Sequence, residues 1–592
     1  MKTSATQTIT ALFAESVHRH ADRPAVSDDA GRRLTYAELD RASARLARTL
    51  VRVGVGREER VGVHRQRDVD LVIGILAALR AGAAYTAVDL RYPKARRDLM
   101  LHAAGARVTL VGADERDAPG PGIATLACGH ESGEPADEPA PLPVAAGEDA
   151  ACVLFTSGST GTPKGVVVEH RNLVHFALNP VLPQIVAGDR VAQVANVSFD
   201  TFHYELWCAF AAGAELVMMP SVPDLVQRDP ERELHRRRIS VLLAPTMAFN
   251  SIAVEDAGVF AGLRLLLTGG DVIRPSACRE VLDSAFEGRL TNLYGPTEAT
   301  TAVTAHDITA VAPDAVSVPI GRALDGAALY VLDAAMDPVA PGTPGELYIG
   351  GAATTRGYLG DPARTAERFL PDPFGEPGSV MYRTGDVVTR DADGVVEYLG
   401  RNDNQVKIRG YRVEPREVER SLMARAGVVD AAVLPQGEGQ DRRLVAFVVL
   451  CGELTLPELR GHAEEHLPDY QVPAEFVQVE EIPATPHGKR DAAALLTLLA
   501  DRDRNRTDYV APHTDSERYL ARAWQELLGA EWISTGDDFF AMGGNSMLAF
   551  RLSRRVAREL APGITLEEVL KNTVMRDMAL AVDAALGKAE TA

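Results

Sequence analysis

Apolar positions in the first part of the chain alternate between a helical and a strand-like pattern. In residues 34–54 (LTYAELDRASARLARTLVRVG), Leu39, Ala42, Leu46 and Leu50 recur near the helical period, which predicts an amphipathic helix. Short apolar runs bounded by glycine or proline follow it: VGVHR, AAYTAVDL and RVTLVGAD. Strands that alternate with helices in this way predict parallel sheets flanked by helices, so the expected fold class is α/β.

The pattern changes twice towards the C-terminal end. From about Gly345, short β-like segments such as GELYIGG and VVEYLG are separated by glycines, which predicts a β-rich region. A compact α/β lobe follows, and the charged stretch DRDRNRTDYVAPHTD indicates a linker to a small, mostly helical module. A single core stops growing near ~250–300 residues, so a chain of 592 residues should divide. We expect a large body at 1–400, a small lobe at 401–500, a linker at 501–512 and a helical domain at 513–592.

Composition narrows the range of functions. The chain is 46% hydrophobic and 24% charged, which is ordinary for a globular protein that can bury sizeable cores. Its formal net charge of −20 argues against binding to the phosphate backbone of nucleic acid, which needs clustered lysine and arginine. A small nucleotide is not excluded, because it needs only a few local cations.

Cysteine spacing and hydropathy indicate the compartment. The five cysteines lie far apart and form no CxxC pair, so neither a zinc site nor a disulfide framework is expected. The N-terminal residues acquire a glutamate and two histidines before any signal-like apolar segment develops. No run approaches the ~18 apolar residues of a membrane span. We expect a soluble, cytoplasmic protein with no membrane contact.

The strongest local motif is VLFTSGSTGTPKGVVVEH at residues 153–170, where an apolar strand runs into a loop of serine, threonine and glycine. Glycines let the backbone approach an anion closely, the hydroxyls add donors, and Lys164 adds positive charge. The Walker pattern GxxxxGK[ST] is absent. A flexible surface loop is the alternative interpretation, but an ordered string between two apolar strands favours a phosphate-binding loop.

Further motifs follow in a recognisable order, and with them the sequence resembles the adenylation domains of nonribosomal peptide synthetases, within the adenylate-forming enzymes. The motifs are LTYAEL (34–39), LRAGAAYTAVD (79–89), NLYGPTEATT (292–301), GELYIGG (345–351), YRTGD (382–386), GRNDNQVKIRGYRVE (400–414) and PATPHGKRD (483–491). Thr86-Ala87 departs from the commoner Val-Pro. The resemblance covers nearly the whole chain and implies a body of two α/β sheet subdomains plus a β-rich subdomain, then a small mobile α/β lobe.

The resemblance implies ATP as substrate and assigns residues to its parts. Tyr294 offers an aromatic face and Asn292 an amide for adenine. Asp386 resembles the carboxylate that accepts both ribose hydroxyls, and Arg401 resembles a second ribose contact. Gly270 belongs to the same adenine and ribose set. Phosphate binding is assigned to Thr156, Ser157, Gly158, Ser159, Thr160, Gly161, Lys164 and Thr297.

Three motif residues have roles in catalysis and movement by the same resemblance. Lys489 resembles the lysine that bridges the substrate carboxylate and the α-phosphate, where negative charge builds during adenylation. Glu298 offers a hard oxygen for Mg²⁺, which would bridge ATP phosphates. Asp403 matches the hinge between body and lobe, and rotation there would withdraw Lys489 after adenylation.

The last module contains DDFFAMGGNSMLAFRL at residues 537–552, a turn followed by a helix that starts at Ser546. A serine at a helix start is most often an N-cap. However, DxFFxxGGxS resembles the peptidyl carrier protein motif, whose serine receives 4′-phosphopantetheine from a phosphopantetheinyl transferase. The thiol at the end of that arm could attack an acyl adenylate, and the tether would keep its effective concentration high.

The segment ANVSFDTFHYELW at residues 195–207 matches the start of the family's specificity pocket. Asp200 stands where amino-acid-activating members pair an aspartate with the substrate ammonium. None of the remaining lining is charged, so an uncharged side chain is expected, and an aliphatic one such as Leu, Ile or Val is favoured. A smaller side chain, or an aromatic one given Gly269, stays open. That lining is Thr201, Tyr204, Leu243, Leu267, Gly269, Leu293, Thr301 and Ala302. His203 is interpreted as a packed or surface histidine.

These predictions combine into one expectation and two alternatives. We expect a free-standing adenylation–carrier pair that activates an amino acid with ATP, loads it on Ser546 and passes it to a separate condensation or tailoring enzyme. An MbtH-like helper protein is a further candidate partner. No residue of the sequence decides whether such a helper is required. The alternatives are an aryl or acyl acid ligase fused to a carrier, which Asp200 disfavours, and an inactive body whose carrier is loaded by another enzyme.

Overall fold

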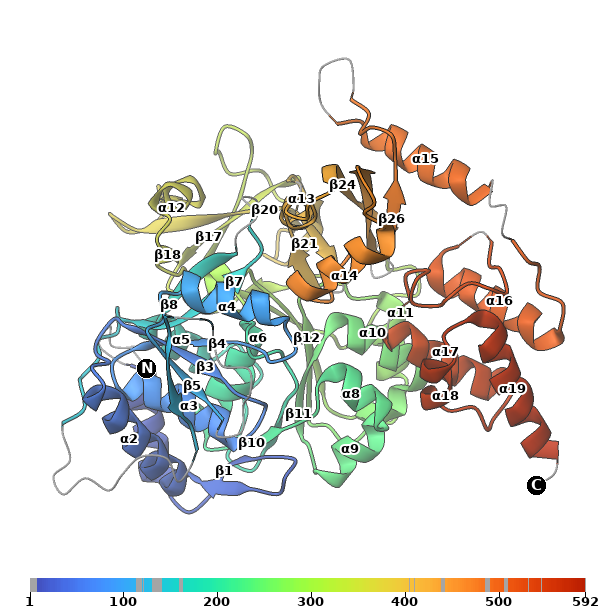
Figure 1. Ribbon diagram of the computed structural model, residues 1–592. Helices are drawn as coiled ribbons and strands as arrows, with labels where there is room; N and C mark the ends of the chain where they lie inside the picture. The colour runs from blue at the N-terminus through green and yellow to red at the C-terminus, as the bar shows by residue number, and fades with distance from the viewer. Residues whose placement is uncertain are drawn as a thin grey trace.

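The computed structural model shows a large body, a smaller lobe above it and a helical domain at the side (Figure 1). Helices and strands follow the order that the sequence pattern predicts, and the α/β class is confirmed. The structure describes residues 8–112, 120, 122–129, 141–158, 163–403, 405–408, 410–437, 442–484, 490–504, 509–530, 532–544 and 546–590.

The first sheet of the body has seven strands, in the order β18-β8-β7-β4-β3-β5-β6. Its central strands are parallel, and β8 pairs with β7 and β18 in antiparallel fashion. The predicted amphipathic helix is α2, which opens with a capping box between Thr35 and Glu38 and buries its apolar positions. The strands are β3 (Arg60–His64), β4 (Ala84–Ala87), β5 (Val108–Val111), β6 (Ala124–Ala127), β7 (Ala150–Thr156), β8 (Lys164–Glu169) and β18 (Gly357–Tyr358). The helices of this part are α1 (Ile9–His20), α2 (Tyr36–Arg52), α3 (Val69–Arg80), α4 (Lys94–Ala103) and α5 (His170–Ala177).

The second sheet has nine strands, in the order β15-β14-β13-β12-β11-β9-β10-β1-β2. Its strands are β1 (Pro24–Ser27), β2 (Arg33–Thr35), β9 (Arg190–Gln193), β10 (Glu215–Met218), β11 (Val241–Pro245), β12 (Leu265–Gly269), β13 (Arg289–Tyr294), β14 (Thr304–Asp307) and β15 (Arg322–Ala323). Its helices are α6 (Thr201–His203), the π-helix η1 (Tyr204–Cys208), α7 (Ala209–Ala212), α8 (Val222–Gln227), α9 (Pro230–Arg236), α10 (Thr246–Asp256), η2 (Ala257–Phe260), α11 (Pro275–Leu282) and η3 (Thr297–Ala299). The strands β9 to β13 are parallel, so their carboxyl ends lie at one edge, where ligands of such sheets bind.

The predicted β-rich region is a five-stranded sheet of order β16-β17-β20-β19, with β21 on β20. Its strands are β16 (Ala327–Leu332), β17 (Gly345–Gly351), β19 (Phe369–Pro371), β20 (Val380–Arg390) and β21 (Val396–Arg401), with helix α12 (Pro362–Arg368) between β18 and β19. The motif GELYIGG is therefore a strand, as predicted. Strands β20 and β21 place Asp386 opposite Arg401.

The lobe begins with the hairpin β22 (Val406–Ile408) and β23 (Tyr411–Val413), and continues as a three-stranded sheet. Its other elements are α13 (Pro415–Met423), β24 (Val428–Gln436), β25 (Arg443–Leu450), α14 (Leu456–His466), β26 (Glu475–Gln478) and α15 (Ala492–Arg504). Helix α15 includes residues 501–504, which the sequence pattern assigned to the linker. Leu495 and Leu499 pack against Val445 and Phe447 of β25, so the anchored helix continues through its charged last turn.

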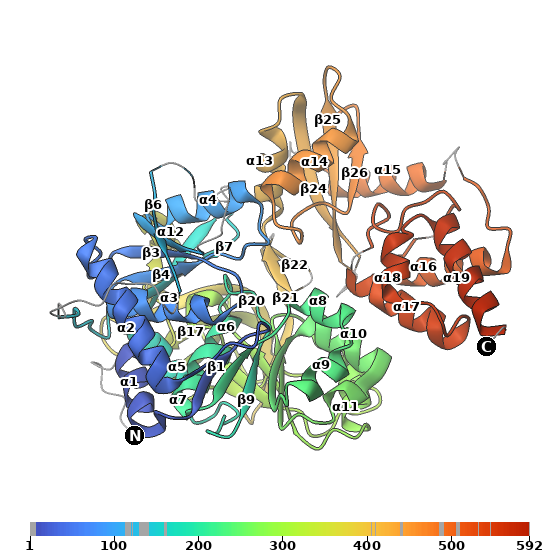
Figure 2. The same cartoon turned by 60° about the horizontal axis from the view of Figure 1, so that its bottom comes forward.

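The C-terminal domain consists of α16 (Asp515–Leu528), α17 (Ser546–Glu559), α18 (Leu566–Lys571) and α19 (Met575–Glu590). The rings of Trp524 and Phe539 meet edge to face, 5.0 Å apart, in its core. The domain sits beside α8 and α10 of the body, with the lobe above it, in both ribbon views (Figures 1 and 2).

Two expectations about the whole chain can be compared with the structure. All five cysteines are free, and four of them are buried. Among the described residues, no helix combines the length and the apolar character that crossing a membrane requires.

Candidate active site

A cavity of about 170 Å³ opens where the carboxyl ends of the second sheet face the lobe. Its walls come from the body and from the lobe hairpin β22–β23. Of the residues that the sequence motifs assigned to a site, it is lined by Thr156, Ser157, Asp200, Thr201, Leu243, Gly269, Gly270, Tyr294, Thr297, Asp386 and Arg401. Motifs from distant parts of the chain therefore meet around one space.

At the end of the cavity that the sequence motifs assign to ribose, hydrogen bonds join a group of side chains around Asp386. Tyr294 donates its hydroxyl to Asp386 Oδ2 at 2.5 Å, and Arg401 donates Nη1 to Asp386 Oδ1 at 2.5 Å. Arg401 also contacts both carboxylate oxygens of Asp403, each at 2.8 Å. Burial and the Asp386 charge raise the pKa of Tyr294 well above its usual range, so its hydroxyl stays a donor. The carboxylate is held rigidly and keeps lone pairs for hydroxyl donors.

The loop that the sequence motifs assign to phosphate binding is described only in part, because Ser159, Thr160 and Gly161 lie outside the described residues. Thr156 Oγ1 is buried without a hydrogen-bond partner among the described residues, so this hydroxyl can still bond a ligand. Ser157 donates its hydroxyl to the carbonyl of Arg412 at 2.7 Å, and the Gly158 amide donates to Glu417 Oε2 at 3.2 Å. The start of the loop thus touches the lobe.

Lys164 lies on β8 at the other side of this loop and is 8% exposed. Its ammonium is 3.7 Å from Glu414 Oε1 and 5.6 Å above the ring of Tyr358. Burial and the nearby Arg412 lower the Lys164 pKa to about 8. A polyanion beside it would favour the charged form.

Glu298 lies in the short helix η3, is fully buried and does not line the cavity. Its carboxylate accepts from Tyr358 Oη at 2.7 Å and pairs with Arg412 Nη1 at 3.2 Å. Burial acts to raise its pKa, but Arg412 and Lys164 outweigh it and bring the pKa to about 2, so the group is ionised. Among the described residues there is no cluster of three or more metal-ligating side chains. A single carboxylate still suits Mg²⁺, which takes one or two from the protein and the rest from phosphates and water.

Asp200 lies immediately before α6, where it lines the cavity beside Thr297. Burial raises the Asp200 pKa to about 6, while the Thr297 hydrogen bond opposes this shift. Its backbone carbonyl accepts the Thr301 hydroxyl at 2.9 Å, and His203 Nδ1 contacts the same hydroxyl at 3.2 Å. His203 is fully buried, and burial lowers its pKa to about 3, so it is a neutral core histidine that helps to place Asp200.

The remaining predicted pocket residues form an apolar wall behind the cavity instead of lining it. Tyr204, Leu267, Leu293 and Ala302 share one buried cluster with Leu243, which does reach the cavity. Thr301, also buried, lies behind Asp200.

Gly269 does line the cavity, but its missing side chain does not provide extra space. A Cβ there would lie 2.4 Å from the carbonyl oxygen of Leu293, its partner in the neighbouring strand. The close approach of β12 and β13 therefore explains this glycine.

Two other residues predicted to contact the nucleotide differ in where they lie relative to the cavity. Gly270 lies at the rim with φ of +94°, and a Cβ added there would lie 3.8 Å from the carbonyl oxygen of Gly410 in the lobe. Asn292 does not line the cavity, and its amide donates to the carbonyl of Pro319 at 2.9 Å. Its amide is thus engaged with the body in this arrangement.

The lobe contributes cavity residues to which the sequence motifs gave no role. These residues are Lys407, Tyr411 and Arg412, which lie within the motif GRNDNQVKIRGYRVE. The place of this motif in the order of the family's motifs was the only sequence feature that pointed to them. Tyr411 stacks on Tyr470 with ring centroids 4.1 Å apart, and Phe199 of the body meets Tyr411 at 5.0 Å. These aromatic contacts pack the lobe against the body.

Lys489, the predicted catalytic residue, lies outside the described residues. The next residue, Arg490, pairs with Glu419 and donates to the carbonyl of Ala431, both within the lobe, and does not line the cavity. The lobe therefore turns its hairpin, not Arg490, towards the cavity.

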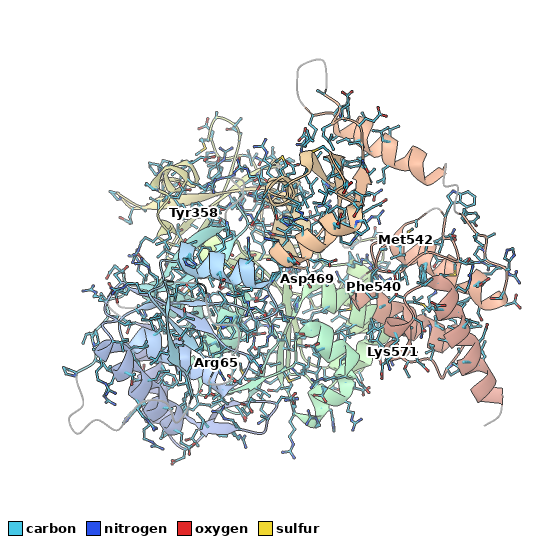
Figure 3. All side chains as sticks on the ribbon, viewed as in Figure 1. Arg65, Tyr358, Asp469, Phe540, Met542 and Lys571 are labelled. Atoms are coloured by element: carbon cyan, nitrogen blue, oxygen red, sulfur yellow. The ribbon has the colours of Figure 1, made fainter. Side chains whose placement is uncertain are left out.

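The helical domain meets the lobe close to Ser546, the first residue of α17, whose side chain is outside the description. Arg443 of β25 donates Nη1 to the carbonyl of Met542 at 2.9 Å, and Figure 3 labels Met542 at this junction. Gly543 has φ of +98°, and a Cβ there would lie 2.7 Å from Arg443 Nη1. The backbone conformation of Gly543 favours glycine at this turn, and the end of the Arg443 side chain approaches it closely.

Three segments of the chain match models of known protein families. Residues 13–359 match the AMP-binding enzyme family, residues 417–489 its C-terminal domain, and residues 518–582 the phosphopantetheine attachment site.

Two curated relatives are similar in sequence to nearly the whole of this chain. Phosphinothricin tripeptide synthetase PhsB of Streptomyces viridochromogenes is 38% identical over 600 residues, which is 98% of this chain and 50% of that protein. Tyrocidine synthase 3 of Brevibacillus parabrevis is 35% identical over 574 residues, which is 97% of this chain and 9% of that protein. The chain thus spans half or less of these relatives.

Solved structures match across the domain boundaries. A holo NRPS protein containing adenylation and PCP domains, bound to a vinylsulfonamide inhibitor, has a TM-score of 0.83 at 28% identity, with 98% of this chain and 97% of that chain covered. An artificially fused adenylation–PCP di-domain from Klebsiella oxytoca has a TM-score of 0.73 at 26% identity, with 85% and 97% covered.

Proposed function

Because this chain belongs to the AMP-binding enzyme family and carries a phosphopantetheine attachment domain, we propose that it activates an amino acid with ATP and loads it on its own carrier at Ser546. The products of the first step are an aminoacyl-AMP and pyrophosphate. The second step transfers the aminoacyl group to the thiol of a 4′-phosphopantetheine arm. The observation that carries the proposal is the single cavity that joins Asp200, the start of the phosphate loop and the Asp386–Arg401 pair.

The substrate assignment rests on Asp200 and on the wall behind it. A carboxylate at the cavity surface would pair with an ammonium, which aryl and fatty acids lack. Tyr204, Leu267, Leu293 and Ala302 pack with Leu243 behind the cavity, so a charged substrate side chain turned towards this wall would face apolar groups instead of a partner. We therefore assign an uncharged L-amino acid, with an aliphatic side chain such as Leu, Ile or Val favoured over an aromatic one. Gly269, whose Cβ position is filled by Leu293, removes the argument for an aromatic side chain.

Other residues of the chain would bind the parts of ATP and Mg²⁺ and bring the two substrates together. Asp386 and Arg401 would hold the ribose, and Thr156, Ser157 and Lys164 would hold phosphates. Bound Mg²⁺ would neutralise charge that develops on the phosphates, and Glu298 is the carboxylate to which we assign it. Lys489 would bridge the substrate carboxylate and the α-phosphate once the lobe turns about Asp403.

The carrier domain implies two protein partners, one that modifies it and one that receives its cargo. A phosphopantetheinyl transferase would attach the arm to Ser546, and a condensation or tailoring enzyme would receive the aminoacyl thioester. An MbtH-like helper protein remains a candidate that a solubility and activity comparison would settle.

Amino-acid-dependent exchange between ATP and labelled pyrophosphate tests the adenylation step. The panel contains the proteinogenic amino acids and several aryl acids, each with and without an MbtH-like protein. We expect exchange with one or a few uncharged aliphatic amino acids. Exchange with an aryl acid would overturn the role of Asp200, and silence across the panel would contradict adenylation by this body.

A further inference from the structure

Helix α17 of the carrier carries a stripe of apolar and basic side chains towards the body. Met547 and Phe550 are one turn apart and are buried in a cluster that also contains residues of α8 and α10. Arg551, Arg554 and Arg558 continue the same face at helical spacing. Figure 1 shows α17 alongside α10, and Figure 2 shows the same neighbours from another side.

Two acidic residues at the end of α10 face these arginines. Glu255 Oε1 lies 3.8 Å from Arg551 Nε, and Glu255 Oε2 lies 3.8 Å from Arg558 Nη1. Asp256 Oδ2 accepts from Arg554 Nη2 at 3.2 Å. The carrier thus contacts the body through apolar side chains at one end of the stripe and ion pairs at the other.

The carboxylate of Glu255 is nearly buried, and the arginines that compensate its charge belong to the carrier. Its side chain is only 8% exposed, and Oε2 accepts no hydrogen bond among the described residues. Burial raises the Glu255 pKa, and the arginines of α17 oppose this shift. Docking of a carrier that lacked those cations would leave a nearly buried carboxylate without compensating charge, which would weaken docking, and acidic side chains at these positions would also repel it.

The stability of α10 does not explain the acidic residue at this place. Glu255 occupies the last turn of the helix, where the helix dipole disfavours negative charge. Asp256 has a local role, since its side chain accepts the amide of Gly258 at 3.1 Å, but Glu255 has no contact of that kind among the described residues. An interaction with a partner accounts for Glu255 better than an interaction within the body.

We propose that Glu255 and Asp256 form a carrier-selecting site, which accepts a carrier helix with Met and Phe at the first positions and arginines at the positions of Arg551, Arg554 and Arg558. A carrier with neutral or acidic residues there would dock poorly and be loaded slowly. The inference rests on the proposed function, because it concerns which carrier receives the aminoacyl group.

Charge reversal in the full-length holo protein tests the proposal. The variants are Glu255→Arg with Asp256→Arg, Arg551→Glu with Arg554→Glu, and all four together, each checked by mass for a complete phosphopantetheine arm before use. Single-turnover loading of the arm should fall at least about tenfold in each two-residue variant and recover in the four-residue variant. Arg518→Glu is the matched control, because Arg518 pairs with Asp515 on α16 and should leave loading unchanged.

Two further measurements separate the possible failures. Wild-type loading should slow as salt rises, whereas the Glu255→Arg, Asp256→Arg variant should lose that dependence or reverse it, because salt screens the repulsion between its arginines and those of α17. Exchange between ATP and pyrophosphate, which needs no carrier, should persist in every variant. If the wild type loads but both reversals load at its rate, or the four-residue variant does not recover, the selecting site is wrong and the proposed function stands. If the wild type shows neither exchange nor loading, the proposed function fails instead.

Discussion

Arg412 of the lobe donates to the buried carboxylate of Glu298 in the body across 3.2 Å. The two residues are far apart in sequence and belong to different parts of the molecule, so the pair depends on the orientation of the lobe. In this orientation a guanidinium neutralises the carboxylate to which we assign Mg²⁺. Rotation of the lobe about the proposed hinge at Asp403 would withdraw Arg412 and free Glu298 for the metal.

The first prediction concerns the Arg412→Ala variant. Without the guanidinium, Glu298 would lose its ion pair with the lobe, which destabilises this lobe orientation by about 1–3 kcal/mol. Since the carrier is docked in this orientation, loading of the arm should slow about 10–100-fold, while ATP–pyrophosphate exchange stays within a few-fold of wild type. Rapid-quench loading and exchange assays on the same preparation measure both steps.

The exposed Arg416 on α13 offers a control, because Arg416→Ala removes a similar charge that does not contact Glu298. An equal fall of exchange and loading in Arg412→Ala would contradict a role restricted to this orientation.

The second prediction uses the Asp200 pKa of about 6, raised by burial. Above that pH the carboxylate is ionised and can pair with the substrate ammonium, and below it protonation removes the pair. The kcat/KM for the amino acid should therefore fall as pH drops through about 6. Asp200→Asn should lower kcat/KM about 10–100-fold at a pH of about 7.5 and abolish that inflection. An unchanged inflection in the variant would assign the titration to another group.

The third prediction concerns nucleotide binding by Asp386. Asp386→Asn removes one acceptor and the ion pair with Arg401, so KM for ATP should rise about 10–100-fold with little change in KM for the amino acid. Asp372→Asn is a matched control, because Asp372 accepts from Tyr330 at 3.1 Å outside the cavity. Steady-state exchange kinetics over both substrates separate the two constants. A rise confined to the amino acid would refute the ribose assignment.

Much of the fold and part of the site could be predicted from the sequence. Apolar periodicity located α2, and glycine-bounded segments located β17, because both depend on local patterns. Motif order alone grouped Asp200, Tyr294 and Asp386 in one site, and all three line the cavity. The end of α15 was missed, since its charged last turn resembles a linker while its anchors, Leu495 and Leu499, lie earlier in the helix.

The rest depended on tertiary contacts that a sequence does not display. Gly269 suggested open space, but its Cβ position is occupied by the Leu293 carbonyl of the next strand. Arg412 stood in a motif without a role, because its partner Glu298 is distant in the chain. The same holds for Arg554 and Asp256, whose pairing exists only when the carrier is docked.

The central claim is that this body loads its own carrier, and intact-protein mass spectrometry of the holo protein tests it most directly. With ATP, Mg²⁺ and the amino acid found by exchange, the wild type should gain the mass of one aminoacyl group on Ser546. Ser546→Ala should carry no arm, Lys489→Ala should carry the arm but load at least about 100-fold more slowly, and the surface variant Lys571→Ala should match wild type. Loading of Lys489→Ala at the wild-type rate, or a wild-type holo protein that gains no mass, would contradict self-loading.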